Sequence, residues 1–417
     1  MSVARQPEGR SSLKPTEFAA RRKSILDRPV GKPDSPRAWS VVAAAFIAGF
    51  VVFGVTYSFG VFLEPIAAEF HVSRAAASAL FSITGLVFYL SGSITGRLGD
   101  RLGPTVVVGA GALVMGASLV LAAILQRLWI GYLVYGVGVG LGAACAYVPT
   151  LALVGGWFTR HRTTALGIAA AGTGCGMLIV PPTAAALTDA FGWRATFAIL
   201  GAGSALLLAA CAALVAPPPL AGTGDHGPLR RTVRSRAFIL LYASWVLATT
   251  ALFVPFVFLP AFALELGAGP VAASALLSLF GGVSIVGRVG IGALARKIGV
   301  VTLFKITVFA MAASYAWWFA ASSYGSLVGF TVVLGLAYGI RIALMPGVLI
   351  EAFGLHDLGA VLGAFFTASG IAAAIGPPLA GAIVDHTGDH RWAIAFAFAT
   401  GLLGFIAILP LRLGRKV

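Results

Sequence analysis

The chain has 417 residues and a formal net charge of +15, yet only 10% of its residues are charged and 59% are hydrophobic, with a mean hydropathy of +0.95. Soluble proteins carry about 25% charged residues, so this composition excludes an ordinary soluble protein and indicates one that crosses a membrane many times. The basic residues lie in short connecting segments and at the N-terminus rather than in a folded basic domain, which argues against a nucleic-acid partner and leaves the lipid bilayer.

Apolar segments follow one another along nearly the whole chain. The first 37 residues contain nine Lys or Arg and no apolar core, so they predict a disordered basic tail and no cleavable signal peptide. Beyond them, twelve segments are long enough to cross a bilayer as tilted helices. They cover residues 38–66, 73–96, 104–126, 129–157, 164–188, 193–216, 237–265, 271–295, 299–322, 326–350, 359–384 and 392–412.

The longest interior polar segment, PPPLAGTGDHGPLRRTVRSR, lies between the sixth and seventh apolar segments. It predicts an all-α membrane protein of two six-helix bundles. The expected parts are a basic tail at 1–37, an N-terminal bundle at 38–216, a central loop at 217–236, a C-terminal bundle at 237–412 and a short tail at 413–417.

Charges in the connecting segments predict the orientation. If the N-terminus is cytoplasmic, 23 Lys or Arg lie on the cytoplasmic side and 4 on the other side, with Arg288 and Arg341 inside the membrane. Cytoplasmic loops of membrane proteins carry such an excess of positive charge. We therefore expect a multi-pass protein of the cell (inner) membrane with both termini, the central loop and the C-terminal tail in the cytoplasm.

The two predicted bundles also repeat in sequence. Matching residues recur at a constant offset of 196 across several pairs of segments, which is typical of carriers built from two parallel halves around a central site. The matches include VFL at 61–63 and 257–259, Glu69 and Glu265, Gly103 and Gly299, and the Pro-Pro pairs at 181–182 and 377–378.

One apolar segment, VAASALLSLFGGVSIVGRVGIGALAR at 271–296, carries a full charge well inside it. A charged side chain near the middle of a membrane costs roughly 2.5–3.5 kcal/mol on insertion scales, so it survives only beside a polar cavity or a partner. Gly281, Ser284, Arg288 and Gly292 recur at three- and four-residue steps and share one helix face. This pattern predicts an arginine that faces a cavity; the alternative is a structural arginine bonded to the carbonyls of a neighbouring broken helix.

Other stretches resemble a known family. GRLGDRLGP at 96–104, between the second and third segments, is similar to the cytoplasmic signature of the major facilitator superfamily. Within the superfamily, YSFGVFLEPIAAEF at 57–70, AYVP at 146–149, WFTRHRTTALGIAAAGTGCG at 157–176 and PPTAAALTDAFGWRATF at 181–197 resemble monocarboxylate transporters of a bacterial type. Oxalate–formate antiporters are close relatives of these.

The resemblance implies a twelve-helix carrier in which an arginine of the eighth crossing binds the carboxylate of the substrate, and Arg288 occupies that position. A guanidinium offers a planar fork that matches the two oxygens of a carboxylate. Three family features differ here: Ser284 stands where an aspartate accompanies the arginine, Tyr57 where the first crossing has a lysine, and the acidic-glycine-tryptophan start of the first crossing is reduced to Trp39. The first two differences put the familiar route of proton coupling in doubt, though not carboxylate binding.

The signature segment suggests a cytoplasmic gate. Asp100 can sit against a helix N-terminus while Arg97 and Arg101 engage carbonyls or acids. An ordinary tight turn with cytoplasmic positive charges is the alternative. The second copy, GALARKIG, has Arg296 where Asp100 stands, so we expect a weaker contact there.

Three further polar side chains of the apolar segments are candidates. Arg341 is either a second contact for the anion or gate, or a charge that extends to the cytoplasmic surface. Tyr147 and Tyr57 are able to donate hydroxyls to a carboxylate, although buried tyrosines commonly bond to backbone carbonyls.

The three cysteines lie singly in apolar segments, and no metal cluster, phosphate loop or nucleophile–base pair is present, so we expect no cofactor, no metal and no enzyme. The sequence thus predicts a carrier of small monocarboxylates such as lactate or pyruvate, working as a monomer by alternating access, with a proton as a candidate co-substrate. A dicarboxylate exchanger and a sensor that binds without transport are the alternatives.

Overall fold

The computed structural model describes residues 32–217, 233–289, 295, 297–353 and 358–411. Most of the predicted N-terminal tail and central loop, and the whole C-terminal tail, lie outside these residues. So do Arg296 and the side chains of Arg97 and Asp100. Almost all of the described chain is helical, because a helix satisfies its own backbone hydrogen bonds where no water is available.

The N-terminal half makes six crossings. Two helices that meet at Ser58 form the first crossing, and a π-helical segment interrupts the fourth. The elements are α2 (Pro36–Tyr57), α3 (Phe59–Phe70), α4 (Arg74–Leu102), α5 (Pro104–Ala122), α6 (Leu128–Gly131), η1 (Tyr132–Val139), α7 (Gly140–Trp157) and α8 (Arg162–Leu214).

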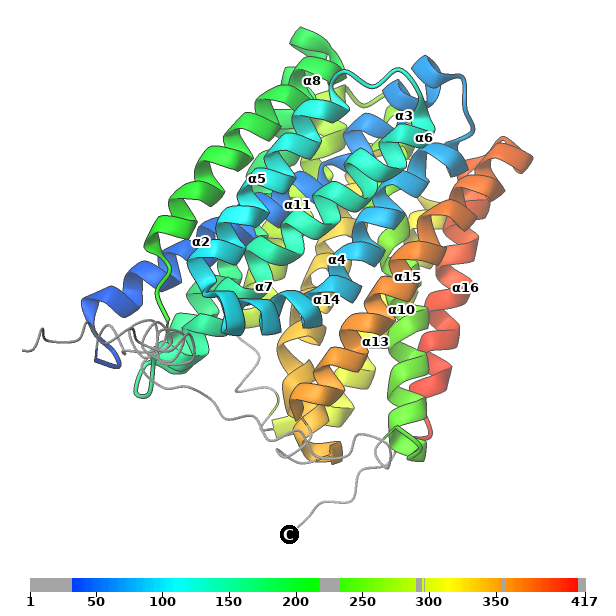
Figure 1. Cartoon of the computed structure of the whole chain (residues 1–417). Helices are drawn as coiled ribbons and strands as arrows, with labels where there is room; N and C mark the ends of the chain where they lie inside the picture. The colour runs from blue at the N-terminus through cyan, green and yellow to red at the C-terminus, as the bar shows by residue number, and fades with distance from the viewer. Residues whose placement is uncertain (1–31, 218–232, 290–294, 296, 354–357, 412–417) are drawn as a thin grey trace, which may run out of the picture.

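Helix α8 contains a sharp turn. Gly192 has φ 78° and ψ 163°, which breaks its 53 residues into a hairpin of two crossings. Figure 1 shows this hairpin turning at the upper end of the molecule. Eleven helical stretches of the described chain are long and apolar enough to cross a membrane, and one of them, Thr164–Leu214, is this hairpin. The predicted number of twelve crossings is therefore confirmed.

The C-terminal half makes the other six crossings, one per helix. They are α10 (Arg236–Glu265), α11 (Pro270–Val289), α13 (Val300–Ala320), α14 (Tyr324–Phe353), α15 (Leu358–Thr387) and α16 (His390–Ile408). Helix α10 is the most enclosed of the crossings, with 89% of its apolar window buried, because it packs both inside its own half and against α3 of the other half.

The backbone confirms the internal repeat. Turns with positive φ recur at the offset of 196 found in the sequence, so the same breaks end the same crossings in both halves. The pairs are His71 (51°) with Gly267 (83°), Gly103 (89°) with Gly299 (91°), and Gly192 (78°) with Gly388 (70°). Glycine adopts this conformation without the steric cost that a side chain brings.

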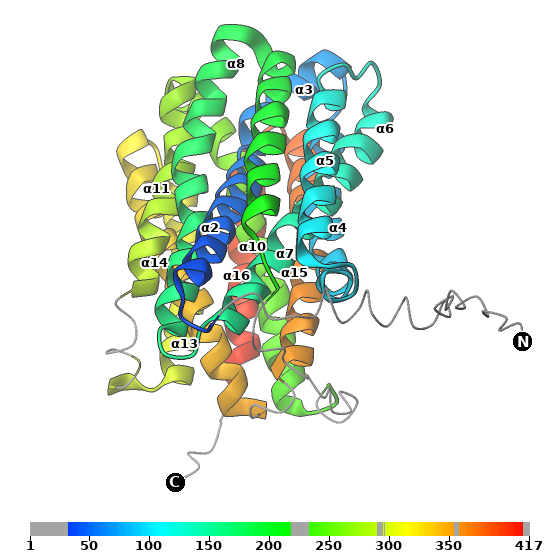
Figure 2. The same ribbon diagram turned by 60° about the vertical axis from the view of Figure 1, so that its left-hand side comes forward.

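The helices run in alternating directions, so α2 begins and α16 ends at the same end of the bundle (Figures 1 and 2). We call this end the termini side and the end with the α8 hairpin turn the far side. The two halves meet mainly through α4 with α15, α8 with α11 and α3 with α10. Small residues permit these contacts: a Cβ on Gly60 would lie 2.7 Å from the Phe256 carbonyl oxygen, and one on Gly85 would lie 2.7 Å from the Cβ of Ala373.

Candidate substrate-binding site

Arg288 lies near the end of the described part of α11 and reaches across to the N-terminal half. Its Nη1 donates to the carbonyl oxygen of Ala170 and to the hydroxyl of Thr173, both over 3.1 Å and both on α8. The guanidinium therefore bridges the two halves of the protein.

The other edge of this guanidinium is free within the described structure. Its Nε is buried without a hydrogen-bond partner, and no described carboxylate lies within ion-pairing distance of Arg288. Nε and Nη2 form one of the two edges at which a guanidinium binds both oxygens of a carboxylate. The site thus holds a positive charge and a donor pair suited to a carboxylate.

Aromatic side chains of both halves lie near Arg288. The Cζ of Arg288 lies 6.0 Å from the centre of the Tyr338 ring on α14. In the other half, Tyr147 and Thr173, the hydroxyl partner of Arg288, pack against the same residue, Gly49 of α2, where a Cβ would lie 3.3 Å from the Tyr147 ring and 3.2 Å from Thr173. The Tyr147 ring packs against Phe53, with centroids 5.0 Å apart. The structure therefore brings Arg288 and Tyr147, two of the predicted site residues, into one environment.

Tyr57 belongs to a contact between the two halves. Its ring stacks on Phe256 of α10 with centroids 4.2 Å apart, and its hydroxyl lies beside that of Tyr89 on α4. This stack joins the two halves, because Tyr57 belongs to the N-terminal half and Phe256 to the C-terminal half.

Sequence reasoning missed Tyr338, Thr173 and Tyr89. Tyr338 precedes Arg341 by three residues in AYGIR, and Thr173 stands between the glycines of GTGCG. A polar side chain inside an apolar segment was the available signal in each case. Nothing in the sequence says that α8 or α14 turns that side chain towards α11.

The expectation that Ser284 shares the face of Arg288 towards a cavity is wrong for this structure. Ser284 is fully buried, and its hydroxyl donates to the carbonyl of Gly281 in its own helix over 2.8 Å. The backbone of Ser284 packs so closely against Gly339 of α14 that no side chain would fit there. Ser284 therefore belongs to a contact between α11 and α14, because small residues such as Ser284 and Gly339 allow two helix backbones to approach closely.

Arg341 lies inside the C-terminal half and is 1% exposed. Its Cζ stacks over the Trp245 ring of α10 at 4.0 Å, and its Nη2 donates to the Thr249 hydroxyl over 3.0 Å. Trp245 in turn donates through Nε1 to Ser369 of α15 over 2.9 Å. Its Nε, like that of Arg288, is buried without a hydrogen-bond partner among the described residues. The described contacts of Arg341 are all made within its own half, and burial excludes the alternative in which it extends to the cytoplasmic surface.

The predicted cytoplasmic gate is visible only in its backbone and in Arg101. Helix α4 continues through the segment to Leu102, breaks at Gly103 with φ 89° and is followed directly by α5. Arg101 is exposed on the termini side, while the side chains of Arg97 and Asp100 lie outside the described ones. Among the described residues no group of three His, Cys, Asp or Glu is arranged to hold a metal ion.

Comparison with known proteins places this geometry in a family. Residues 45–325 match the family model of the Major Facilitator Superfamily. Monocarboxylate transporter 3 of Rattus norvegicus is 32% identical over 379 residues, covering 87% of this chain and 77% of the relative. Monocarboxylate transporter 13 of Bos taurus is 30% identical, covering 91% and 90%. The chain belongs to the monocarboxylate transporter family of this superfamily.

Solved structures agree on the fold of this transporter. A bacterial homolog to the human lysosomal transporter Spinster, in an inward-facing and unoccupied conformation, superimposes with a TM-score of 0.72, covering 90% of this chain and 98% of the other. The occupied form of the same homolog gives a TM-score of 0.74. Both are 16% identical to this chain, so they show the major facilitator fold alone. The predicted family and fold are confirmed.

Proposed function

We propose that this transporter moves small monocarboxylates, such as lactate or pyruvate, across the cell membrane by alternating access. The observation that carries the proposal is the position of the Arg288 guanidinium, which is bonded across the interface between the halves and has an unpartnered Nε among the described residues. A buried charge without a counter-charge is costly, so a bound carboxylate would supply what this site lacks.

Alternating access follows from the way Arg288 is held. Its bonds to Ala170 and Thr173 join α11 to α8, which belong to different halves. When the halves rock, these bonds must lengthen or break, and the guanidinium becomes free to follow the substrate to the other side. Binding and the change of access are coupled through one side chain.

A single positive charge balances a single carboxylate. A dicarboxylate would leave one carboxylate unpaired at Arg288, and the described partners of Arg341 are groups of its own half. This supports a monoanion over the alternative dicarboxylate exchanger. We further propose a monomer with both termini cytoplasmic, following the loop charges, and a termini-side gate formed by Arg97, Asp100 and Arg101.

The decisive experiment is uptake and counterflow in proteoliposomes. Labelled lactate, pyruvate and oxalate are compared in wild type and Arg288→Ala, with Arg127→Ala, an exposed far-side arginine, as the matched control. We expect saturable uptake and counterflow of a monocarboxylate that Arg288→Ala loses and Arg127→Ala retains. Binding without counterflow would instead indicate a sensor, and a pH gradient across the same vesicles tests proton coupling.

A further inference from the structure

A carboxylate on the far side joins the two halves directly. Asp385, near the end of α15, accepts hydrogen bonds from the backbone amides of Arg74 and Ala75, the first two residues of α4, each over 2.9 Å. Helix N-termini carry unsatisfied amides and partial positive charge, and hydrogen bonds to a carboxylate are roughly twice as strong as neutral ones. We call these two bonds the far-side latch.

Close packing makes the far-side latch possible. Gly381 lies one turn before Asp385, and a Cβ at Gly381 would be only 2.7 Å from both the N and the Cα of Ala75. The absent side chain lets α15 approach the end of α4 closely enough for both carboxylate oxygens to reach amides. Ser73 satisfies a third amide by accepting from Ala76 over 3.2 Å.

The charged neighbours do not compete for this carboxylate. The Arg74 side chain turns to Glu64 of α3, with Nε to Oε1 at 2.7 Å and Nη2 to Oε2 at 3.2 Å. Glu265 and Asp385 also act electrostatically on Arg74, and His386 beside Asp385 is exposed. The amides of α4 therefore remain available to Asp385 alone.

The internal repeat places an equivalent carboxylate at the other corner of the far side. At the offset of 196, Asp385 corresponds to Asp189 of α8, and the start of α4 corresponds to the start of α11. Two of the differences between the two corners bear on the latch. Ala185 replaces Gly381, and its methyl group prevents the close approach; Pro270 replaces Arg74, and proline has no amide to donate.

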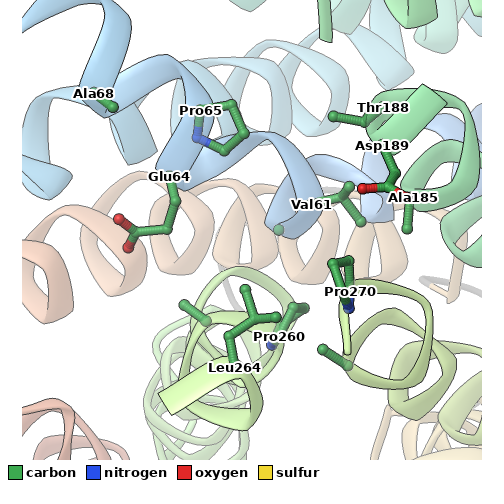
Figure 3. Close-up of a pocket in the computed structure, with 13 residues that line it drawn as sticks. Val61, Glu64, Pro65, Ala68, Ala185, Thr188, Asp189, Pro260, Leu264 and Pro270 are labelled. Atoms are coloured by element: carbon green, nitrogen blue, oxygen red, sulfur yellow. The ribbon is translucent and has the colours of Figure 1, made fainter. Parts of the chain in front are cut away.

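The structure shows the result of these two replacements. Asp189 and Asp385 are both exposed, but among the described residues only Asp385 has hydrogen bonds to the start of a helix of the other half. At the Asp189 corner a pocket opens instead, lined by Ala185, Asp189 and Pro270 among others (Figure 3). In the close-up, Asp189 and Ala185 project from α8 on one side of the pocket, and Pro270 lies on the other side.

We propose that the far-side latch formed by Asp385 holds the far side of this transporter closed, and that Asp189 has no such role. Opening the far side must separate α15 from α4 and break both bonds, whereas the α8–α11 corner has no equivalent bonds to break. The α4–α15 corner would thus stabilise the closed far side more than the α8–α11 corner does. The transporter would favour the state in which the far side is closed.

Distance measurements between spin labels test the latch without any substrate. The labels are attached at Arg127→Cys and Thr387→Cys, exposed far-side positions of the two halves, in protein whose three native cysteines are replaced and which is reconstituted in nanodiscs. In wild type we expect the short-distance population to dominate. Asp385→Asn, whose amide oxygen replaces only one acceptor, should raise the ratio of long to short distances about tenfold, as expected for loss of a charge-assisted bond.

Asp189→Asn is the matched control and should leave the distance distribution unchanged. Equal distributions for wild type and Asp385→Asn, or an equal shift in Asp189→Asn, would overturn the proposal. Gly381→Ala is a second variant, which keeps the carboxylate of Asp385. Its added methyl group should push α15 away from the start of α4 and shift the distance distribution in the same direction as Asp385→Asn. If Asp385→Asn does not fold, an unchanged distribution in Gly381→Ala overturns the proposal.

The repeat also offers a gain of function. Ala185→Gly combined with Pro270→Ala restores the missing space and the missing amide, so a second latch should form at Asp189 and lower the long-distance population. These measurements do not involve Arg288 or transport. A failure of the proposed monocarboxylate function would therefore leave the latch standing, and the reverse also holds.

Discussion

Arg288 and Thr173 are joined across the interface between the two halves, with Nη1 donating to the threonine hydroxyl over 3.1 Å. Thr173 also donates to the carbonyl of Ala170, which accepts from the same Nη1. One edge of the guanidinium is thereby fixed on α8, and its Nε edge is left for the substrate. The proposed binding residue is oriented by the half of the protein to which it does not belong.

Replacing Arg288 by lysine tests whether geometry matters as well as charge. Lysine keeps the positive charge but offers a point charge in place of a planar fork, so it cannot bind both carboxylate oxygens while bonded to α8. We expect Arg288→Lys to reduce the initial rate of monocarboxylate uptake at least tenfold. Uptake within a factor of two of wild type, at equal expression and correct insertion, would contradict the two-pronged contact.

Thr173→Val should raise KM while leaving the maximal rate nearly unchanged. The valine keeps the shape of threonine but cannot accept from Arg288, and a net hydrogen bond contributes about 0.5–1.5 kcal/mol. That range corresponds to a KM about two- to twelvefold higher in the uptake assay. Thr173→Ser, which restores the hydroxyl, should return KM towards wild type; if it does not, the hydroxyl is not what orients Arg288.

Arg341→Gln should leave the ranking of substrates unchanged. Arg341 is bonded to α10 inside the C-terminal half, so its charge does not pair with a second carboxylate of the substrate. We expect oxalate and malonate to compete against labelled lactate equally in wild type and variant. A shift of the inhibition profile towards simple monoanions would show that Arg341 reaches the substrate after all.

The same residue should be replaceable by methionine at little cost in stability. Exchanging a buried charge for a well-packed apolar side chain is often neutral or stabilising, because the desolvation cost disappears. Arg341→Met should therefore unfold within a few degrees of wild type in a thermal assay in detergent. A large drop in Tm would mean that the Trp245 stack stabilises the half by more than the buried charge destabilises it.

Two glycines of α8 offer a matched pair for testing packing. A Cβ at Gly176 would collide with the carbonyl oxygen of Phe50 on α2, whereas one at Gly167 would meet nothing within 4 Å. Overpacking costs about 1–3 kcal/mol or more, so Gly176→Ala should lower Tm clearly. Gly167→Ala should hold or raise it, because alanine favours helix by up to about 1 kcal/mol.

Asp34 anchors the start of the first crossing on the termini side, and its contribution should depend on pH. The Thr159 hydroxyl, together with the amides of Arg160, His161 and Thr159, holds the pKa of Asp34 well below its usual range. A carboxyl whose folded-state pKa is lowered stabilises the fold above its unfolded value near 3.8 and loses that contribution as pH falls towards the folded value.

Wild type should therefore unfold at a higher Tm than Asp34→Asn at pH 7, and the difference should narrow only below about pH 4. Thermal unfolding in detergent from pH 7 to pH 3 measures this. A difference that stays constant over the whole range would show that Asp34 acts through packing rather than through its charge.

The number of crossings and the positions of the main turns could be predicted from the sequence. Hydropathy is a property of each segment by itself, because a helix in lipid satisfies its own backbone and needs only an apolar surface. The repeat at an offset of 196 marked the turns as well, because glycine at positions such as 103 and 299 allows the positive φ that breaks a helix. Arg288 was identifiable for a related reason: a charge inside an apolar segment requires a partner, whatever the fold.

Only the tertiary structure decided which neighbours these side chains have. Arg341 and Arg288 give the same signal in sequence, yet one is enclosed by Trp245 and Thr249 of its own half and the other reaches α8 across the interface. Ser284 shares a helix face with Arg288, but the approach of Gly339 turns that face into a packing contact. The rotation of each helix about its axis is set by close contacts with several other helices at once. An apolar segment whose sides are nearly equal in hydropathy carries no record of that rotation.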